Sequence, residues 1–93
     1  MKYLIIIEKG DNNYSAFSPD IHGCVTVGDT IENTFTNMKE AIDLYFEDTI
    51  ENSNDIPKPK GLEYHIREGI FNEGQIAEDY FITQVEIQLP TLA

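Results

Sequence analysis

The stretch that decides the fold is PDIHGCVTVGDT, residues 19–30. Pro19 and Gly23 are typical of a tight turn, because proline presets one backbone angle and glycine tolerates the left-handed region. The small, apolar and β-branched run at 24–27 then predicts a short strand, which Gly28 ends. The last two residues of the stretch carry side-chain oxygens that can cap a helix. The stretch therefore predicts a turn, a strand and the start of a helix.

An amphipathic helix is predicted over Ile31–Glu51. Either Asp29 or Thr30 can cap it, and Asp29 with Glu32 has the spacing of a capping box. Side chains that recur at spacings of three and four form one stripe along this helix. They are Ile31, Phe35, Met38, Ile42, Tyr45 and Thr49. The opposite side carries Glu40, Asp43, Glu47 and Glu51. We expect the stripe to pack in the core and the acidic side to meet solvent.

Leu44 does not fit this stripe. At about 100° per residue it lies outside the apolar side of the helix, near Asn37, Ala41 and Asp48. Two interpretations stay open. A single exposed leucine is common on protein surfaces, or Leu44 contacts another chain.

Three strands are predicted before the helix. Lys2–Glu8 is apolar at both odd and even positions, which is typical of a central strand covered on both faces. The turn-forming residues 10–13 join it to a second strand, Tyr14–Phe17, as a hairpin. With the strand at 24–27 these segments form an antiparallel meander.

A fourth strand is predicted at Phe81–Leu89, where Pro90 ends an alternating pattern. Its expected buried face consists of Phe81, Thr83, Val85, Ile87 and Leu89. The other face is polar, so we expect this strand at the sheet edge or at least in contact with water. Between the long helix and this strand, two prolines in residues 52–61 predict an exposed linker.

Residues 62–71 fit two patterns. Leu62, Tyr64 and Ile66 alternate as in a strand, whereas Leu62, Ile66 and Ile70 recur as in a helix. We favour a short helix. The predicted fold class is therefore α+β, with a small antiparallel sheet made of a three-strand meander plus a C-terminal strand. One long amphipathic helix packs on one face of this sheet.

The composition restricts the partners of the chain. Six basic against seventeen acidic residues give a net charge of −11, which repels nucleic-acid phosphates and anionic lipids. We expect no direct nucleic-acid binding and favour a basic protein partner, although acidic composition also serves solubility. The longest apolar run, Tyr3–Ile7, is too short for a signal sequence or a membrane span. A single cysteine, Cys24, excludes an intramolecular disulfide and fits the cytoplasm.

Few residues suggest catalysis. His22 and Cys24 are two acceptable zinc or copper ligands, but two ligands are too few for a site. Cys24 would also need an electropositive setting to act as a nucleophile, which an acidic chain scarcely provides. Glu8 and Asp20 could approach each other as an acid–base pair near the first hairpin. We regard an enzyme that uses these groups as a minor alternative, and expect no catalytic residues, no metal and no cofactor.

The most specific pattern in the chain is Pro19-Asp20-Ile21-x-Gly23-Cys24-Val25-Thr26-x-Gly28-Asp29-Thr30. This pattern resembles that of the HicB-like antitoxin family, and the resemblance covers about residues 1–50 and the final strand with Pro90. It implies a partial RNase H-like sheet with a helix on one face and without the carboxylates of a two-metal nuclease. The apolar first strand agrees, because such a nuclease would place an aspartate there.

The resemblance also implies a function, namely binding and neutralising a small basic RNA-cleaving toxin. Many family members carry a C-terminal DNA-binding domain. This sequence ends at Ala93, directly after the predicted final strand, so we expect a single domain over residues 1–93 without that module. The acidic helix residues Glu40, Asp43 and Glu47 are the candidate toxin contacts. The alternative function is a stand-alone oligomeric adaptor or scaffold without a toxin partner.

Self-association is the last expectation from the sequence. Short strands and a half-polar final strand leave sheet edges that a small domain must protect. Pairing with a second copy protects them, and Leu44 is the candidate contact. We therefore expect a homo-oligomer rather than a monomer.

Overall fold

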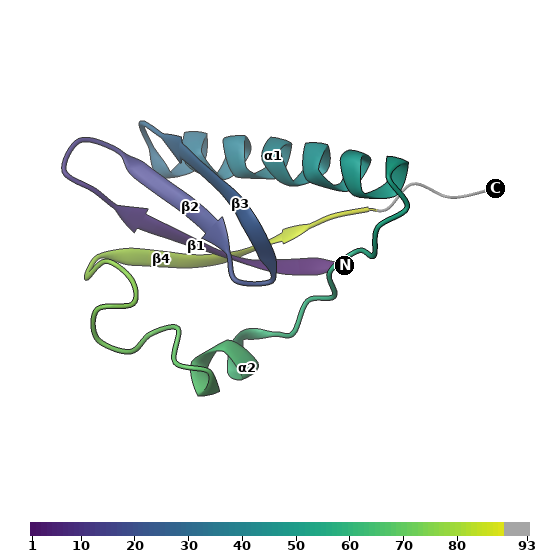
Figure 1. Cartoon of the computed structure of the whole chain (residues 1–93). Coiled ribbons are helices and arrows are strands. Elements are labelled where there is room, and N and C mark those ends of the chain that lie inside the picture. The colour runs from purple at the N-terminus through teal and green to yellow at the C-terminus, as the bar shows by residue number, and fades with distance from the viewer. Residues whose placement is uncertain (89–93) are drawn as a thin grey trace.

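A computed structural model, which describes residues 1–88, shows a four-stranded antiparallel sheet with two helices (Figure 1). The elements in chain order are β1 (Lys2–Lys9), β2 (Tyr14–Ser18), β3 (Ile21–Gly28), α1 (Ile31–Glu51), α2 (Leu62–Arg67) and β4 (Tyr80–Glu86). The strands are arranged as β3-β2-β1-β4, so β1 is central and β3 and β4 form the two edges. The predicted α+β class, with one long helix on one face of the sheet, is confirmed. The RNase H-like relationship stays a prediction.

The core lies between the sheet and α1. All side chains from Tyr3 to Ile7 in β1 are buried, as expected for a central strand covered on both faces. Tyr3, Ile5 and Ile7 pack against Met38, Ile42 and Phe46 of α1. Strand alternation turns Leu4 and Ile6 to the opposite face. Figure 1 shows α2 and the segment that follows it on that side of the sheet, away from α1.

Helix α1 begins and ends at the predicted residues. Thr30, rather than Asp29, is its cap, because Thr30 Oγ1 accepts a hydrogen bond from Asn33 N at 3.0 Å. The buried residues are Thr34, Met38, Ile42, Phe46 and Thr49. The predicted stripe is therefore right in direction, although Phe46 occupies a more buried place than Phe35 or Tyr45. The acidic side of the helix is exposed as expected.

Strand β3 begins earlier than the sequence pattern predicted. Phe17 pairs with Val25 and Ser18 pairs with Ile21, so β3 carries three extra residues that bulge from the ladder. Gly23 lies within this bulge with φ of 79°, a conformation that glycine adopts without steric cost. The bulge allows Ile21 and Cys24 to be buried while His22 stays exposed. Residues 21–23, predicted as a turn, therefore belong to a bulged strand.

Gly28 is required because the helix start approaches it closely. A Cβ atom at this position would lie 2.8 Å from Thr34 N and 2.9 Å from Thr34 Cα, both backbone atoms that cannot move aside cheaply. We expect Gly28→Ala to lower the free energy of unfolding by about 1–3 kcal/mol, as overpacking typically does. Urea unfolding measures this change. Asp29→Ala is the matched control, since Asp29 is exposed and does not cap α1, and equal stability of the two variants would contradict the explanation.

The last two elements, α2 and β4, are a helix and a strand as predicted. The side chains that they bury differ in part from the predicted ones. Residues 62–67 form the favoured short helix, yet its buried residue is His65, while Leu62 and Ile66 are exposed. Strand β4 lies at the sheet edge and buries Val85, but Phe81 is 47% exposed. The buried Ile87 follows the strand, which ends at Glu86. The predictions for Leu89 and Pro90 lie outside the described residues. Among residues 1–88, no helix has the length and apolar character needed to cross a membrane.

Candidate partner-binding surface

The outer side of α1 is an exposed acidic surface. Glu40, Asp43 and Glu47 follow one another at spacings of three and four, so they project from the helix side that faces away from the sheet. We call these three residues the acidic face. In the part of the chain that the structure describes, no ion pair neutralises any of the three. Their negative field is therefore available to a partner.

A hollow adjoins the acidic face near the end of β4. Its volume is about 240 Å³, and it lies between Asp43 and Glu47 on one side and apolar side chains on another. The apolar lining residues are Phe46, Ile50 and Ile87. An aliphatic stem can rest on such a surface while a cationic end group meets a carboxylate. The hollow is therefore suited to a lysine or arginine side chain.

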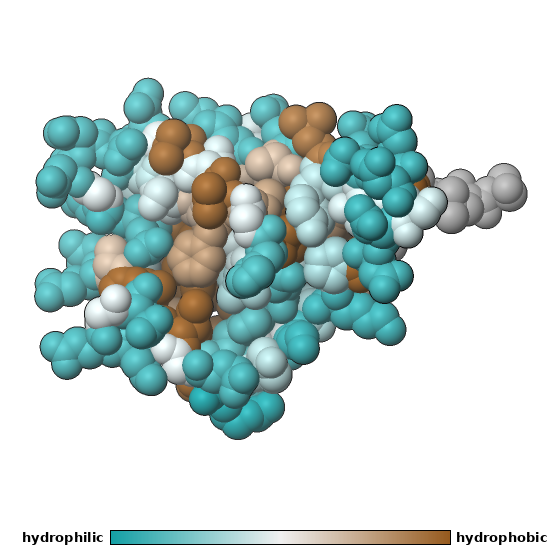
Figure 2. Space-filling model, in the orientation of Figure 1, coloured by the Kyte–Doolittle hydropathy of each residue, from teal (hydrophilic) through white to brown (hydrophobic). Residues whose placement is uncertain are grey.

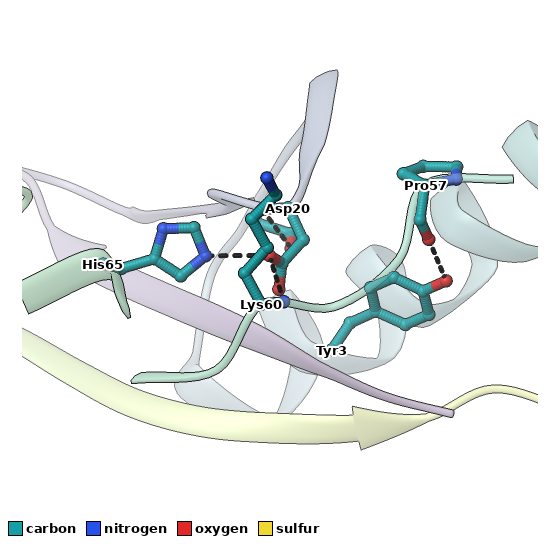
Figure 3. A network of polar contacts seen from close by, with 6 residues as sticks. Tyr3, Asp20, Pro57, Lys60 and His65 are labelled. Atoms are coloured by element: carbon teal, nitrogen blue, oxygen red, sulfur yellow. Dashed lines mark hydrogen bonds and ion pairs between the residues drawn. The ribbon is translucent and has the colours of Figure 1, made fainter. Parts of the chain in front are cut away.

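A buried carboxylate holds the segment after α1 against the sheet (Figure 3). Asp20, in the turn between β2 and β3, has a side chain that is 0% exposed. Its Oδ1 lies 2.8 Å from His65 Nε2 and accepts a hydrogen bond from Lys60 N at 3.0 Å. Its Oδ2 is buried and has no hydrogen-bond partner among the described residues. Asp20 thus joins the first half of the chain to α2.

A second anchor comes from Tyr3 in the central strand. The Tyr3 hydroxyl donates to the Pro57 carbonyl at 2.6 Å, and the Tyr3 ring meets Phe46 edge-on with centroids 5.3 Å apart. Burial raises the pKa of the Tyr3 phenol, and the nearby negative charge of Asp20 raises it further by a smaller amount. The phenol therefore stays protonated and keeps its donor role through the neutral range.

The structure does not bring the predicted acid–base pair together. Glu8 lies opposite Ser15 and accepts a hydrogen bond from Ala77 N at 2.6 Å. Asp20 follows the other end of β2 and binds different donors, so each carboxylate serves to anchor a later segment of the chain. The pattern of residue types gave no indication of these long-range partners, since Asp20 and His65 are 45 positions apart.

His22 and Cys24 lie in different environments. The bulge in β3 leaves His22 exposed and buries Cys24. Burial raises the pKa of the Cys24 thiol, which lowers the fraction of reactive thiolate at neutral pH. Within residues 1–88, no three or more His, Cys, Asp or Glu side chains form a group that could hold a metal ion.

Comparison with known families identifies the family of this chain. The family described as "HicB_like antitoxin of bacterial toxin-antitoxin system" matches residues 3–90. The chain belongs to this HicB-like antitoxin family. The matched range includes all strands and helices of this HicB-like chain except Lys2, the first residue of β1, and it includes the buried Asp20 and the acidic face.

Solved structures share the fold of the HicB-like chain. The N-terminal domain of Burkholderia pseudomallei antitoxin HicB aligns with a TM-score of 0.75 and 26% identity, covering 96% of this chain and 100% of that one. A chain of the HicA3 and HicB3 toxin-antitoxin complex aligns with a TM-score of 0.72 and 27% identity, covering 96% and 100%.

A curated relative extends the similarity to phage proteins. An uncharacterized 14.9 kDa protein in the rep-hol intergenic region of Haemophilus phage HP1 is 33% identical over 92 residues. That alignment covers 99% of the HicB-like chain and 65% of the phage protein. The chain therefore spans just under two thirds of the length of this relative.

Proposed function

We propose that this HicB-like chain is an antitoxin that binds and neutralises a small basic RNA-cleaving toxin. The observation that carries the proposal is the family match over residues 3–90, which includes all but the first two of the described residues. Similarity to a chain of a solved toxin-antitoxin complex supports the same role. A cytoplasmic location, where RNA is available to such a toxin, fits this function.

Electrostatic attraction supports a basic partner. A net charge of −11 and an acidic face that forms no ion pair within residues 1–88 draw a cationic protein toward α1. The hollow beside Asp43 and Glu47 then offers carboxylates and apolar surface to one long basic side chain. We infer that Glu40, Asp43 and Glu47 contact the toxin.

Neutralisation follows from competition for the same basic groups. A protein that cleaves RNA must bind phosphates, and it does so largely with lysine and arginine. Carboxylates of the acidic face can occupy those cations in place of phosphates, and the bound domain excludes the RNA strand sterically. This mechanism requires binding alone and uses no catalytic group of the antitoxin.

The proposal is tested with any small basic protein that a gene next to the gene of this chain encodes. We expect that protein to arrest growth when it is produced alone and to cleave RNA in vitro. Co-production of the HicB-like chain should restore growth, and an equimolar amount should stop the cleavage. Unchanged cleavage in the presence of excess folded chain would refute the antitoxin role. The absence of any such basic neighbour would favour the stand-alone adaptor instead.

A further inference from the structure

A hollow lies between the sheet and the segment that follows α2, on the side of the sheet away from α1. Phe17 pairs with Ile6 of β1 and with Val25 of β3. Residues paired across strands share a face, and Ile6 faces away from α1, so Phe17 and Val25 face the α2 side. Ile70, from the segment after α2, lines the same hollow. Val25 is 69% exposed, so the hollow is open to solvent.

The hollow has the size and the lining of a small-ligand site. Its volume is about 380 Å³. Ligand pockets of about 300–1,000 Å³ combine an apolar lining with a few polar groups that select the ligand. Phe17, Val25 and Ile70 supply apolar lining here. In Figure 2, hydrophobic side chains lie between the region of β2 and β3 and the region of α2, with hydrophilic side chains around them.

His65 lines the hollow with a hydrogen-bond acceptor that the described chain does not use. Its Nε2 lies 2.8 Å from Asp20 Oδ1, and because a carboxylate only accepts hydrogen bonds, Nε2 carries the proton of the neutral ring. Figure 3 shows the other ring nitrogen, Nδ1, turned away from Asp20. Nδ1 has no hydrogen-bond partner within residues 1–88. Among these residues only Asp20 Oδ2 is both enclosed and without a partner, so Nδ1 is open to solvent although the His65 side chain is 8% exposed.

Glu68 gives the hollow a negative charge. It follows His65 by three positions, so the two side chains project from the same side of the helix end. Among the described lining residues it is the only Asp, Glu, Lys or Arg. A histidine whose other ring nitrogen meets a carboxylate is also typical of metal ligands, but within residues 1–88 no set of ligands completes such a site. The lining thus favours a cation that donates hydrogen bonds.

We propose that this hollow binds a small primary amine with an apolar body, such as an arylalkylamine. The ammonium group has three donors, so it donates to His65 Nδ1 and also pairs with the Glu68 carboxylate. The apolar body packs on Phe17, Val25 and Ile70. A chain with a net charge of −11 attracts such a cation and repels molecules that carry carboxylate or phosphate. The proposal does not rest on the antitoxin role, because α1 with its acidic face lies on the other side of the sheet.

Nuclear magnetic resonance with phenethylamine as the probe tests the proposal without any toxin. We expect saturable shifts of the backbone amide signals of Phe17, Val25 and Ile70. The dissociation constant should be about 1 mM or lower, which a ligand of about nine non-hydrogen atoms can reach. The His65 Nδ1 signal should shift in the same titration, because this nitrogen accepts a hydrogen bond. No saturation at these residues with about 10 mM probe, or shifts confined to the acidic face, would overturn the proposal.

Two molecules with the same phenyl body test the role of the amine. Phenylethyl alcohol keeps a donor but lacks the charge, so it should bind about two- to fivefold more weakly, the range for a solvent-exposed ion pair. Phenylacetate carries a negative charge and no donor, and it should cause no saturable shifts. Equal binding of phenylacetate and phenethylamine would show that apolar contact alone fills the hollow, against the proposal.

Two pairs of variants with equal changes in charge locate the site. Glu68→Gln should raise the dissociation constant of phenethylamine about two- to fivefold, whereas Glu63→Gln, at an exposed position of α2 outside the hollow, should not change it. Val25→Arg should raise the constant about tenfold or more by placing a cation in the hollow. Val27→Arg, on the same face of β3 but outside the hollow, should not. Circular dichroism verifies that all four variants fold, and equal effects within either pair would refute the assigned location.

Competition with the toxin distinguishes a free amine from a lysine side chain of the partner. Saturating phenethylamine should leave toxin neutralisation unchanged, because the acidic face lies on the other side of the sheet. Displacement of the toxin by phenethylamine, abolished by Val25→Arg, would assign the hollow to a toxin side chain and would overturn the proposal of a free ligand.

Discussion

Asp20→Ala is expected to lower the free energy of unfolding by about 1–3 kcal/mol, the range for leaving a buried hydrogen-bonding group without its partner. The Asp20 side chain is fully buried, and its Oδ1 contacts both His65 Nε2 and Lys60 N. Its removal leaves a cavity and a nearly buried imidazole without its partner. Urea unfolding followed by circular dichroism measures the loss.

Controls distinguish the loss of the Asp20 hydrogen bonds from a general loss of acidic charge. Asp55→Ala removes an exposed aspartate and should change stability by less than about 0.5 kcal/mol. His65→Ala should be destabilising, and combining it with Asp20→Ala should cost less than the sum of the two single changes, because both remove one contact. Additive effects, or an Asp20→Ala protein as stable as the wild type, would contradict the stabilising contact between Asp20 and His65.

The titration of Tyr3 gives an independent measurement. The negative charge of Asp20 adds to burial in raising the pKa of the Tyr3 phenol, so Asp20→Ala should lower that pKa. Because the folded-state pKa is raised, the stability from protonated Tyr3 is present below the unfolded pKa of about 10 and lost as pH rises through the folded pKa. The wild type should therefore lose stability in strongly alkaline solution. Tyrosinate absorbance, compared with a Tyr3→Phe variant, follows this titration.

Reversing the acidic face is expected to slow toxin association about 10- to 100-fold at low salt, the range in which electrostatic steering acts. The triple variant Glu40→Lys, Asp43→Lys and Glu47→Lys replaces three negative charges by three positive ones. It changes the net charge from −11 to −5. All three side chains are exposed, so the fold should be retained. Stopped-flow mixing with the basic toxin measures the association rate.

A second triple variant has the same net charge but keeps the acidic face. Glu68, Glu73 and Glu78 are exposed on the segment between α2 and β4, and their replacement by lysine also gives a net charge of −5. This control should slow association much less, because steering depends on the charges that face the partner. The difference between the two variants should shrink at high salt. Equal rates for both would show that overall charge, rather than the acidic face, attracts the toxin.

Periodic patterns explain why most of the fold was predictable. The 3.6-residue repeat of α1 and the capping residue before it predicted Ile31–Glu51 at both ends. The unbroken apolar run in β1 predicted a central strand covered on both faces. The short helix α2 was harder to predict from its pattern, because its buried residue is His65 rather than an apolar one. Its orientation depends on Asp20, which lies 45 positions before His65 in the sequence.

The sequence by itself determined the element types, their order, the acidic side of α1 and the exposure of Leu44. These properties depend on neighbours within one or two turns of chain, where the periodicity of side chains directs them to one face. Only the tertiary structure decided that Asp20 meets His65, that Glu8 and Asp20 stay apart, and that Asn37 of α1 meets the Val27 carbonyl of β3. Those relations depend on how distant segments cross, which is set by the packing of the whole core rather than by spacing along the chain.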